Sequence, residues 1–161
     1  MDVSQAVEYR LTGSEMNLAA IAGVQRALDA VRRGRKGRYG AENGAGFDYD
    51  VCGCIGELAV AKHLNRYWNG NFLDLDAADV DRDYQVRASL FDGPRCGMFL
   101  HSPDKDHQPF IGCFVRLPSV WVMGWVFGRE GKLDPYWRAD LKRPAFVVPY
   151  PDLHPISSLV V

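Results

Sequence analysis

Two segments decide the fold that we expect for this chain. The first reads Gly56-Glu57-Leu58-Ala59-Val60-Ala61-Lys62-His63-Leu64-Asn65, and the second reads Tyr84-Gln85-Val86-Arg87-Ala88-Ser89-Leu90. On a helical wheel at about 100° per residue, Glu57 shares one stripe with Val60, Ala61, Leu64 and Trp68, so residues 55–68 are predicted to form a helix. An unpaired carboxylate is costly to bury. Glu57 therefore needs a cation, strong hydrogen-bond donors or a metal ion as its partner.

The second segment alternates between apolar and polar residues. Tyr84, Val86, Ala88 and Leu90 are separated by Gln85, Arg87 and Ser89. This period of two predicts a β-strand. Gln85 and Arg87 then project from the same face of the strand, about 7 Å apart.

Further elements are predicted on both sides of these two segments. Thr12-Gly13-Ser14-Glu15 has the pattern of a capping box, and it opens an amphipathic helix over 13–33 whose apolar positions are Leu18, Ile21, Ala22, Val24, Leu28 and Val31. Residues 34–50 read as a glycine-rich loop. Strands are predicted at 97–102, 109–116, 119–127 and 145–149, and Asp134-Pro135 begins a short helix over 134–138. This order predicts an α/β fold with a mixed sheet and helices packed against it.

Size and composition favour one domain. The 161 residues are expected to form a single unit, in which 1–50 supply the N-terminal helix and basic loop and 51–161 the core. No apolar stretch approaches the roughly 20 residues that span a bilayer, and the first residues lack a secretory pattern. We therefore expect a cytoplasmic protein without membrane association. The four cysteines are expected to be buried free thiols rather than disulfides or zinc ligands: Cys52, Cys54, Cys96 and Cys113.

Charge is strongly segregated along the chain, although the formal net charge is only −1. A basic run lies just after the first predicted helix and consists of Arg32, Arg33, Arg35, Lys36 and Arg38. An acidic stretch precedes the predicted strand and consists of Asp74, Asp76, Asp79, Asp81 and Asp83. The pair of runs suits a nucleic-acid-binding arm beside an acidic metal site. Two solvated loops, or a basic helix end favoured by the helix dipole, explain the same residues.

The two segments resemble the PD-(D/E)XK nuclease superfamily when they are taken together with three further stretches of the sequence. These are Ala78-Asp79-Val80, His101…Asp104-Lys105-Asp106 and Gly128-Arg129-Glu130-Gly131-Lys132. More narrowly, the chain is similar to small members encoded by phages and prophages. The resemblance covers residues 52–153. It implies a nuclease-like core with Mg²⁺ or Mn²⁺ as cofactor. Glu57 and Asp79 would be metal ligands, Gln85 would stand in the place of the second acid, and Arg87 in that of the lysine.

The last two positions depart from the superfamily pattern. The amide of Gln85 offers a carbonyl oxygen but no charge, and Arg87 can stabilise a phosphate but cannot act as a base. Three functions remain open: a magnesium-dependent DNA nuclease or resolvase-like enzyme, a DNA-binding protein of nuclease fold that does not cleave, and a phage accessory protein that binds a host or virion protein. A phage-encoded protein would act in the host-cell cytoplasm. A buried Glu57–Arg87 bridge without metal is the structural alternative. A homodimer is also left open.

Overall fold

The computed structural model describes residues 5–34, 47–68, 70, 78–81, 83–90, 92 and 96–159. Its elements are β1 (Val7–Arg10), α1 (Gly13–Arg32), α2 (Phe47–His63), β2 (Gln85–Ser89), β3 (Gly97–Leu100), β4 (Pro109–Arg116), β5 (Ser119–Phe127), α3 (Gly128–Gly131), β6 (Trp137–Arg138) and β7 (Ala145–Pro149). Three 3₁₀ turns follow β5 and β7, at Asp134–Tyr136, Tyr150–Asp152 and Ile156–Ser158.

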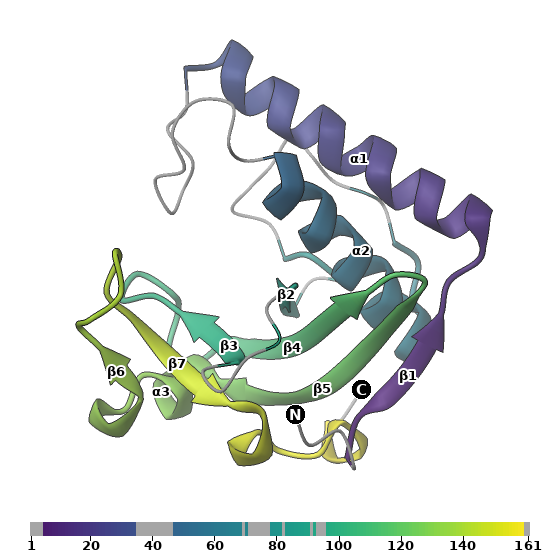
Figure 1. Cartoon of the computed structure of the whole chain (residues 1–161). Coiled ribbons are helices and arrows are strands. Elements are labelled where there is room, and N and C mark those ends of the chain that lie inside the picture. The colour runs from purple at the N-terminus through teal and green to yellow at the C-terminus, as the bar shows by residue number, and fades with distance from the viewer. Residues whose placement is uncertain are drawn as a thin grey trace.

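The strands form two sheets. The first has the order β1-β5-β4-β2, in which β2 runs parallel to β4 and the other neighbours are antiparallel. The second is antiparallel, with the order β3-β7-β6. In Figure 1, α2 lies between the first sheet and α1, and α1 is the outermost layer. The mixed α/β class expected from the sequence is confirmed at this level.

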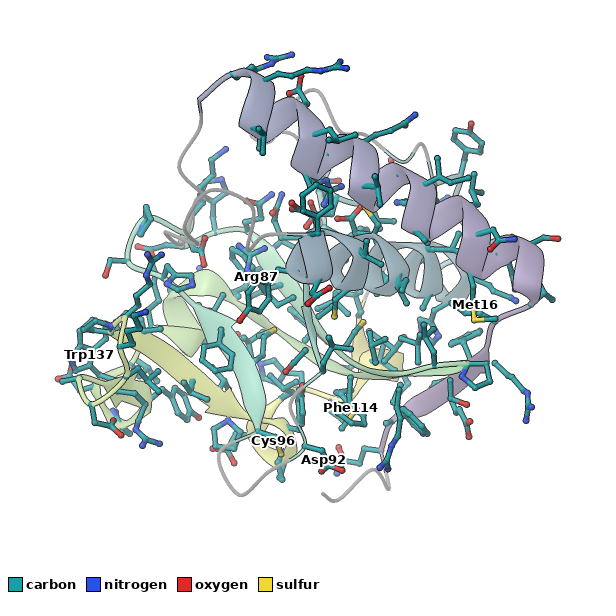
Figure 2. All side chains as sticks on the ribbon, turned by 45° about the horizontal axis from the view of Figure 1, so that its top comes forward. Met16, Arg87, Asp92, Cys96, Phe114 and Trp137 are labelled. Carbon is teal, nitrogen blue, oxygen red and sulfur yellow. The ribbon has the colours of Figure 1, made fainter. Side chains whose placement is uncertain are left out.

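Both faces of the central strand β4 are covered. Ile111, Cys113 and Val115 belong to an apolar cluster shared with α2. Phe110 and Phe114 belong to a second cluster with β3 and β7, and Phe114 is labelled in Figure 2. This double coverage is the reason that β4 is buried along nearly its whole length instead of alternating with solvent.

Helix α1 begins as predicted but packs through a different face. Thr12 Oγ1 accepts a hydrogen bond from Glu15 N at 3.2 Å, and Thr12 N donates to Glu15 Oε2 at 2.7 Å, so the capping box is confirmed. The buried residues are small, however: Ala19, Ala22, Gly23 and Ala27. Of the predicted apolar positions Ala22 is buried, whereas Leu18, Ile21, Val24, Leu28 and Val31 are exposed. A Cβ at Gly23 would lie 2.5 Å from Val51 Cα, so the two helix backbones approach too closely for larger side chains.

Helix α2 begins and ends earlier than predicted. Residues 47–50 are helical, so the loop expected over 34–50 is wrong there, while 35–46 lie outside the described residues. At its end Asn65 adopts a positive φ of 52°, and Arg66 N donates to Ala61 O at 2.8 Å. This is a Schellman-type termination, which stops the helix before the predicted residue 68.

Among the other elements, the strands predicted at 109–116, 119–127 and 145–149 have these bounds in the structure. Those predicted at 84–90 and 97–102 are shorter, and the helix predicted over 134–138 is a 3₁₀ turn followed by β6. Strand β1 and the short helix α3 were not predicted. Cys52, Cys54 and Cys113 are buried free thiols, and Cys96 is a half-buried one. No helix in the described part of the chain is long and apolar enough to cross a membrane.

Candidate functional site

The four predicted site residues lie on three elements that meet where α2 crosses β2. Glu57 is on α2, Asp79 immediately precedes the turn closed by the Val80–Tyr84 bridge, and Gln85 and Arg87 are on β2. Gly56 permits the close approach, since a Cβ there would lie 2.7 Å from Ala88 Cβ. In Figure 2 the Arg87 side chain is labelled beside α2, between the helices and the strands.

Glu57 is buried, as the helical wheel predicts, and its partner is Arg26 of α1. Arg26 Nη1 donates to Glu57 Oε1 at 2.7 Å and Nη2 donates to Oε2 at 3.0 Å, while Trp68 Nε1 donates to Oε2 at 3.2 Å. The side chains of Arg26 and Glu57 are 13% and 4% exposed. Gly53, one helical turn before Glu57, lies beside the guanidinium, and a Cβ there would be in ordinary van der Waals contact with it, 3.7 Å from Arg26 Nη1. The result is a buried, bidentate ion pair with a third donor.

The electrostatics of this pair follow from its burial. Burial opposes the charge of Arg26, but the hydrogen bonds to Glu57 and the charge of Glu57 outweigh it, so the pKa of Arg26 lies above its ordinary value. Asp50 lies nearby on α2. Burial raises its pKa, against the opposing charge of Arg26. Arg26 therefore serves as the cation for an acidic neighbourhood at the junction of α1 and α2.

Asp79 is tied to the start of β2. Its Oδ2 accepts a hydrogen bond from Val86 N at 2.7 Å, and its own N–H donates to Tyr84 O at 2.9 Å. Burial, and then the charge of Glu57, raise the pKa of Asp79 to about 7, in spite of the Val86 hydrogen bond and the charge of Arg87. The charge of Glu57 therefore adds to burial in disfavouring the charged form of Asp79.

Arg87 pairs with Asp104, not with Glu57. Arg87 Nη2 lies 3.0 Å from Asp104 Oδ1, and Nη1 lies 4.0 Å from Asp79 Oδ2. The same Nη1 donates to Gln85 Oε1 at 3.4 Å, and the guanidinium lies 4.8 Å from the centre of the Phe110 ring. The alternative of a Glu57–Arg87 bridge is thus wrong: each of these residues has its own oppositely charged partner.

Asp104 and Arg26 complete the site, and neither was predicted as a site residue. Asp104 Oδ2 also accepts from His101 N at 2.9 Å, so Arg87 fastens the segment between β3 and β4 to β2. Arg26 carried a usable signal in the sequence, since it is a cation placed among the small residues Ala19, Ala22, Gly23 and Ala27 at helical spacing. For Asp104 the sequence held no such signal, apart from its place in the segment His101…Asp104-Lys105-Asp106 that contributes to the resemblance.

The oxygen atoms of Glu57, Asp79 and Gln85 do not form a suitable set of magnesium ligands in this arrangement. Magnesium requires near-octahedral oxygen ligands with little competing positive charge. Glu57 is held by a guanidinium and an indole, Asp79 lies beside Arg87, and Gln85 adds no charge. In the described part of the chain, no group of three or more His, Cys, Asp or Glu residues is arranged to hold a metal ion. What the site can do as built is hold α1, α2, β2 and the segment before β4 together.

The predicted nucleic-acid-binding residues are described only in part. Arg32 is exposed in the last turn of α1, and Arg33 Nε lies 2.9 Å from Asp29 Oδ2 on the same helix. Arg35, Lys36 and Arg38 lie outside the described residues, as do Asp74 and Asp76. Arg33 is seven residues beyond Arg26, which corresponds to about 10 Å along the helix axis. The part of the basic run that the structure describes, Arg32 and Arg33, therefore lies further along α1 than Arg26, and it is not among the ion pairs of Glu57, Asp79 and Arg87.

Comparison with protein-family models, with curated proteins and with solved structures gave no match for this chain.

Proposed function

We propose that this chain is a DNA-binding protein with a PD-(D/E)XK-like core that does not cleave DNA. Its two candidate metal ligands, Glu57 and Asp79, lie beside the cations Arg26 and Arg87 in place of a metal ion. We call this arrangement the closed centre. Four residues support a core of this kind by their order in the chain: Glu57, Asp79, Gln85 and Arg87. They lie on a helix, before a turn and on a strand, and these elements meet in the fold. The same order favours a nuclease-like scaffold over an unrelated α/β domain. A fold alone does not decide chemistry, so the proposal depends on the state of the four side chains.

We expect no cleavage because of the hydrogen bonds that Glu57 makes. Both carboxylate oxygens of Glu57 are engaged, by Arg26 and by Trp68, inside the protein. To ligate a metal ion, Glu57 would have to leave Arg26. That would take two charged hydrogen bonds away from a guanidinium whose side chain is 13% exposed. Breaking a buried ion pair costs several kcal/mol, so we expect the closed arrangement to be favoured over a metal-binding one.

DNA binding is proposed from the basic run that begins at the end of α1. Arg32 and Arg33 are followed in the sequence by Arg35, Lys36 and Arg38, a density of positive charge that suits contacts with a phosphate backbone. Arg87 is engaged by Asp104 and is not assigned a role in binding. Contacts of this kind position a protein on DNA without reading its sequence, so we expect little sequence preference.

Fluorescence anisotropy with a labelled duplex, in EDTA and across a salt series, tests the proposal. The logarithm of affinity should fall linearly with the logarithm of salt concentration, with a slope of about −0.9 per phosphate contacted. The variant Arg32→Gln/Arg33→Gln/Arg35→Gln should bind more weakly and lower the magnitude of that slope by up to about 2.7. A matched control, Arg10→Gln/Arg66→Gln/Arg116→Gln, removes the same charge from residues that are exposed in other parts of the fold. Equal losses in the two variants, or an affinity that is insensitive to salt, would refute DNA binding by the basic run.

A plasmid assay tests the closed centre separately. Supercoiled plasmid incubated with the protein and Mg²⁺ or Mn²⁺ should remain intact. Nicking that is abolished by Asp79→Asn, in a variant that remains folded, would overturn the closed centre and establish the metal-dependent nuclease reading in its place. The carboxyamide keeps the shape of Asp79 and an acceptor for Val86 N, so loss of nicking would report on charge rather than on folding.

A further inference from the structure

Helix α1 carries an apolar stripe on the side that faces away from α2. The stripe consists of Leu18, Ile21, Val24, Leu28 and Val31, whose exposed fractions are 56%, 58%, 38%, 43% and 50%. Its opposite face holds the small residues that pack on α2. In Figure 1, α1 is the outermost layer of the molecule, with α2 beneath it. A row of large apolar side chains on an outer helix marks an interaction surface.

The spacing of the stripe is symmetric about its middle. Relative to the midpoint between Val24 and Gln25, Leu18 and Val31 are equidistant, and so are Ile21 and Leu28. Val24 lies next to the midpoint. When a second copy of the helix is laid antiparallel to the first about this midpoint, Leu18 therefore comes opposite Val31 and Ile21 comes opposite Leu28. A two-fold interface requires such self-complementarity, because each residue must meet the partner that meets it in return.

The charges on α1 favour an antiparallel partner. The helix has Glu15 in its first turn and Arg32 in its last turn, and the basic run continues beyond it. A parallel pair would place two basic runs side by side, which repel. With the midpoint between Val24 and Gln25 on the axis, an antiparallel pair separates the two copies of Arg32 by about 22 Å along the helices, which exceeds the Debye length of about 8–10 Å at physiological salt. It also sets the two helix dipoles in opposite directions.

We propose that two copies of this chain associate through their α1 helices, antiparallel about a two-fold axis near Val24. Leu18 of one copy then packs on Val31 of the other, and Ile21 on Leu28. A contact confined to one helix is smaller than the standard interface of about 1,200–2,000 Å². We therefore expect a reversible dimer whose population depends on protein concentration. This inference is independent of DNA binding and of the closed centre.

Sedimentation velocity over a concentration series tests the association. The wild-type chain should shift from monomer to dimer as its concentration rises. In Ile21→Glu/Leu28→Glu two pairs of like charges face each other across the axis, which should weaken association by at least about 100-fold. Both positions are exposed in the single chain, so the monomer should remain folded by circular dichroism. Leu133→Glu is the matched control, since Leu133 is 52% exposed and lies outside α1, and it should dimerise like the wild type.

Thiol cross-linking tests the direction of the helices, in a Cys96→Ser background because Cys96 is the half-buried thiol. With a short bismaleimide, Val24→Cys should cross-link to itself. Leu18→Cys should not, since in an antiparallel pair the two copies of residue 18 are about 20 Å apart along the axis. Self-cross-linking of Leu18→Cys would overturn the antiparallel arrangement. A monomeric wild type at several hundred micromolar, or a dimer that persists in Ile21→Glu/Leu28→Glu, would overturn the interface itself.

Discussion

The buried pair between Arg26 and Glu57 allows a direct test of the closed centre through stability. We consider Arg26→Met, which keeps an unbranched side chain on α1 but removes the guanidinium. Glu57 then keeps the Trp68 Nε1 donor and loses two charged hydrogen bonds, of 2.7 and 3.0 Å. Its carboxylate remains inside the protein with a side chain that is 4% exposed.

The magnitude follows from this geometry. Removing one partner of a buried ion pair costs about 3–5 kcal/mol, because the other charge is left uncompensated. For a chain of this size each kcal/mol corresponds to about 2–4 °C in Tm, so the loss should be about 10 °C. In Arg26→Met/Glu57→Leu both charges are absent, and apolar replacement of a buried pair is often neutral. The double variant should therefore regain most of the lost stability.

Urea denaturation at constant pH gives the free energies of unfolding, and an unchanged m value shows that the denatured state is the same. Arg33→Met is a control on the same helix. Arg33 also pairs with an acid, Asp29, but the two side chains are 44% and 19% exposed. Exposed pairs contribute about 0–1 kcal/mol, so this control should be nearly neutral. If Arg26→Met were as mild as Arg33→Met, Glu57 would have another way to be stabilised, and the closed centre would be refuted.

Two further predictions concern Asp79 and the contact between the helices. Burial and the charge of Glu57 raise the pKa of Asp79 from 3.8 to about 7, so between these values the native state binds more protons than the unfolded state and stability falls as pH rises. The free energy of unfolding of Asp79→Asn, from urea denaturation, should therefore exceed that of the wild type by more at pH 8 than at pH 5; an equal difference would contradict the raised pKa. In Gly23→Ala the new Cβ would lie 2.5 Å from Val51 Cα, and Tm should fall by the equivalent of about 1–3 kcal/mol. Gly13→Ala, where no atom lies within 4 Å, should not lower Tm, and a similar loss in both variants would argue against the close packing.

Local patterns predicted several elements correctly. The capping box placed the start of α1, because its hydrogen bonds join residues only three apart. Alternating side chains predicted β2, with Gln85 and Arg87 in contact through their side chains. The position of Glu57 among apolar residues predicted its burial and its need for a partner. These properties depend on near neighbours in the chain, and the sequence therefore determines them by itself.

Only the tertiary structure decided which surfaces meet. Helix α1 has both a stripe of large apolar residues and a face of small ones, and helical periodicity cannot rank them. The small face packs because Gly23 lets α1 approach the backbone of α2 at Val51. Helix α2 lies in the middle layer and is buried on several sides, so its early start at Phe47 carried no amphipathic signal. The partners of Glu57 and Arg87 were likewise set by elements distant in the chain, namely α1 and the segment before β4. Charge pairing depends on distances in space, and residues 26 and 57 became neighbours only when the two helices packed.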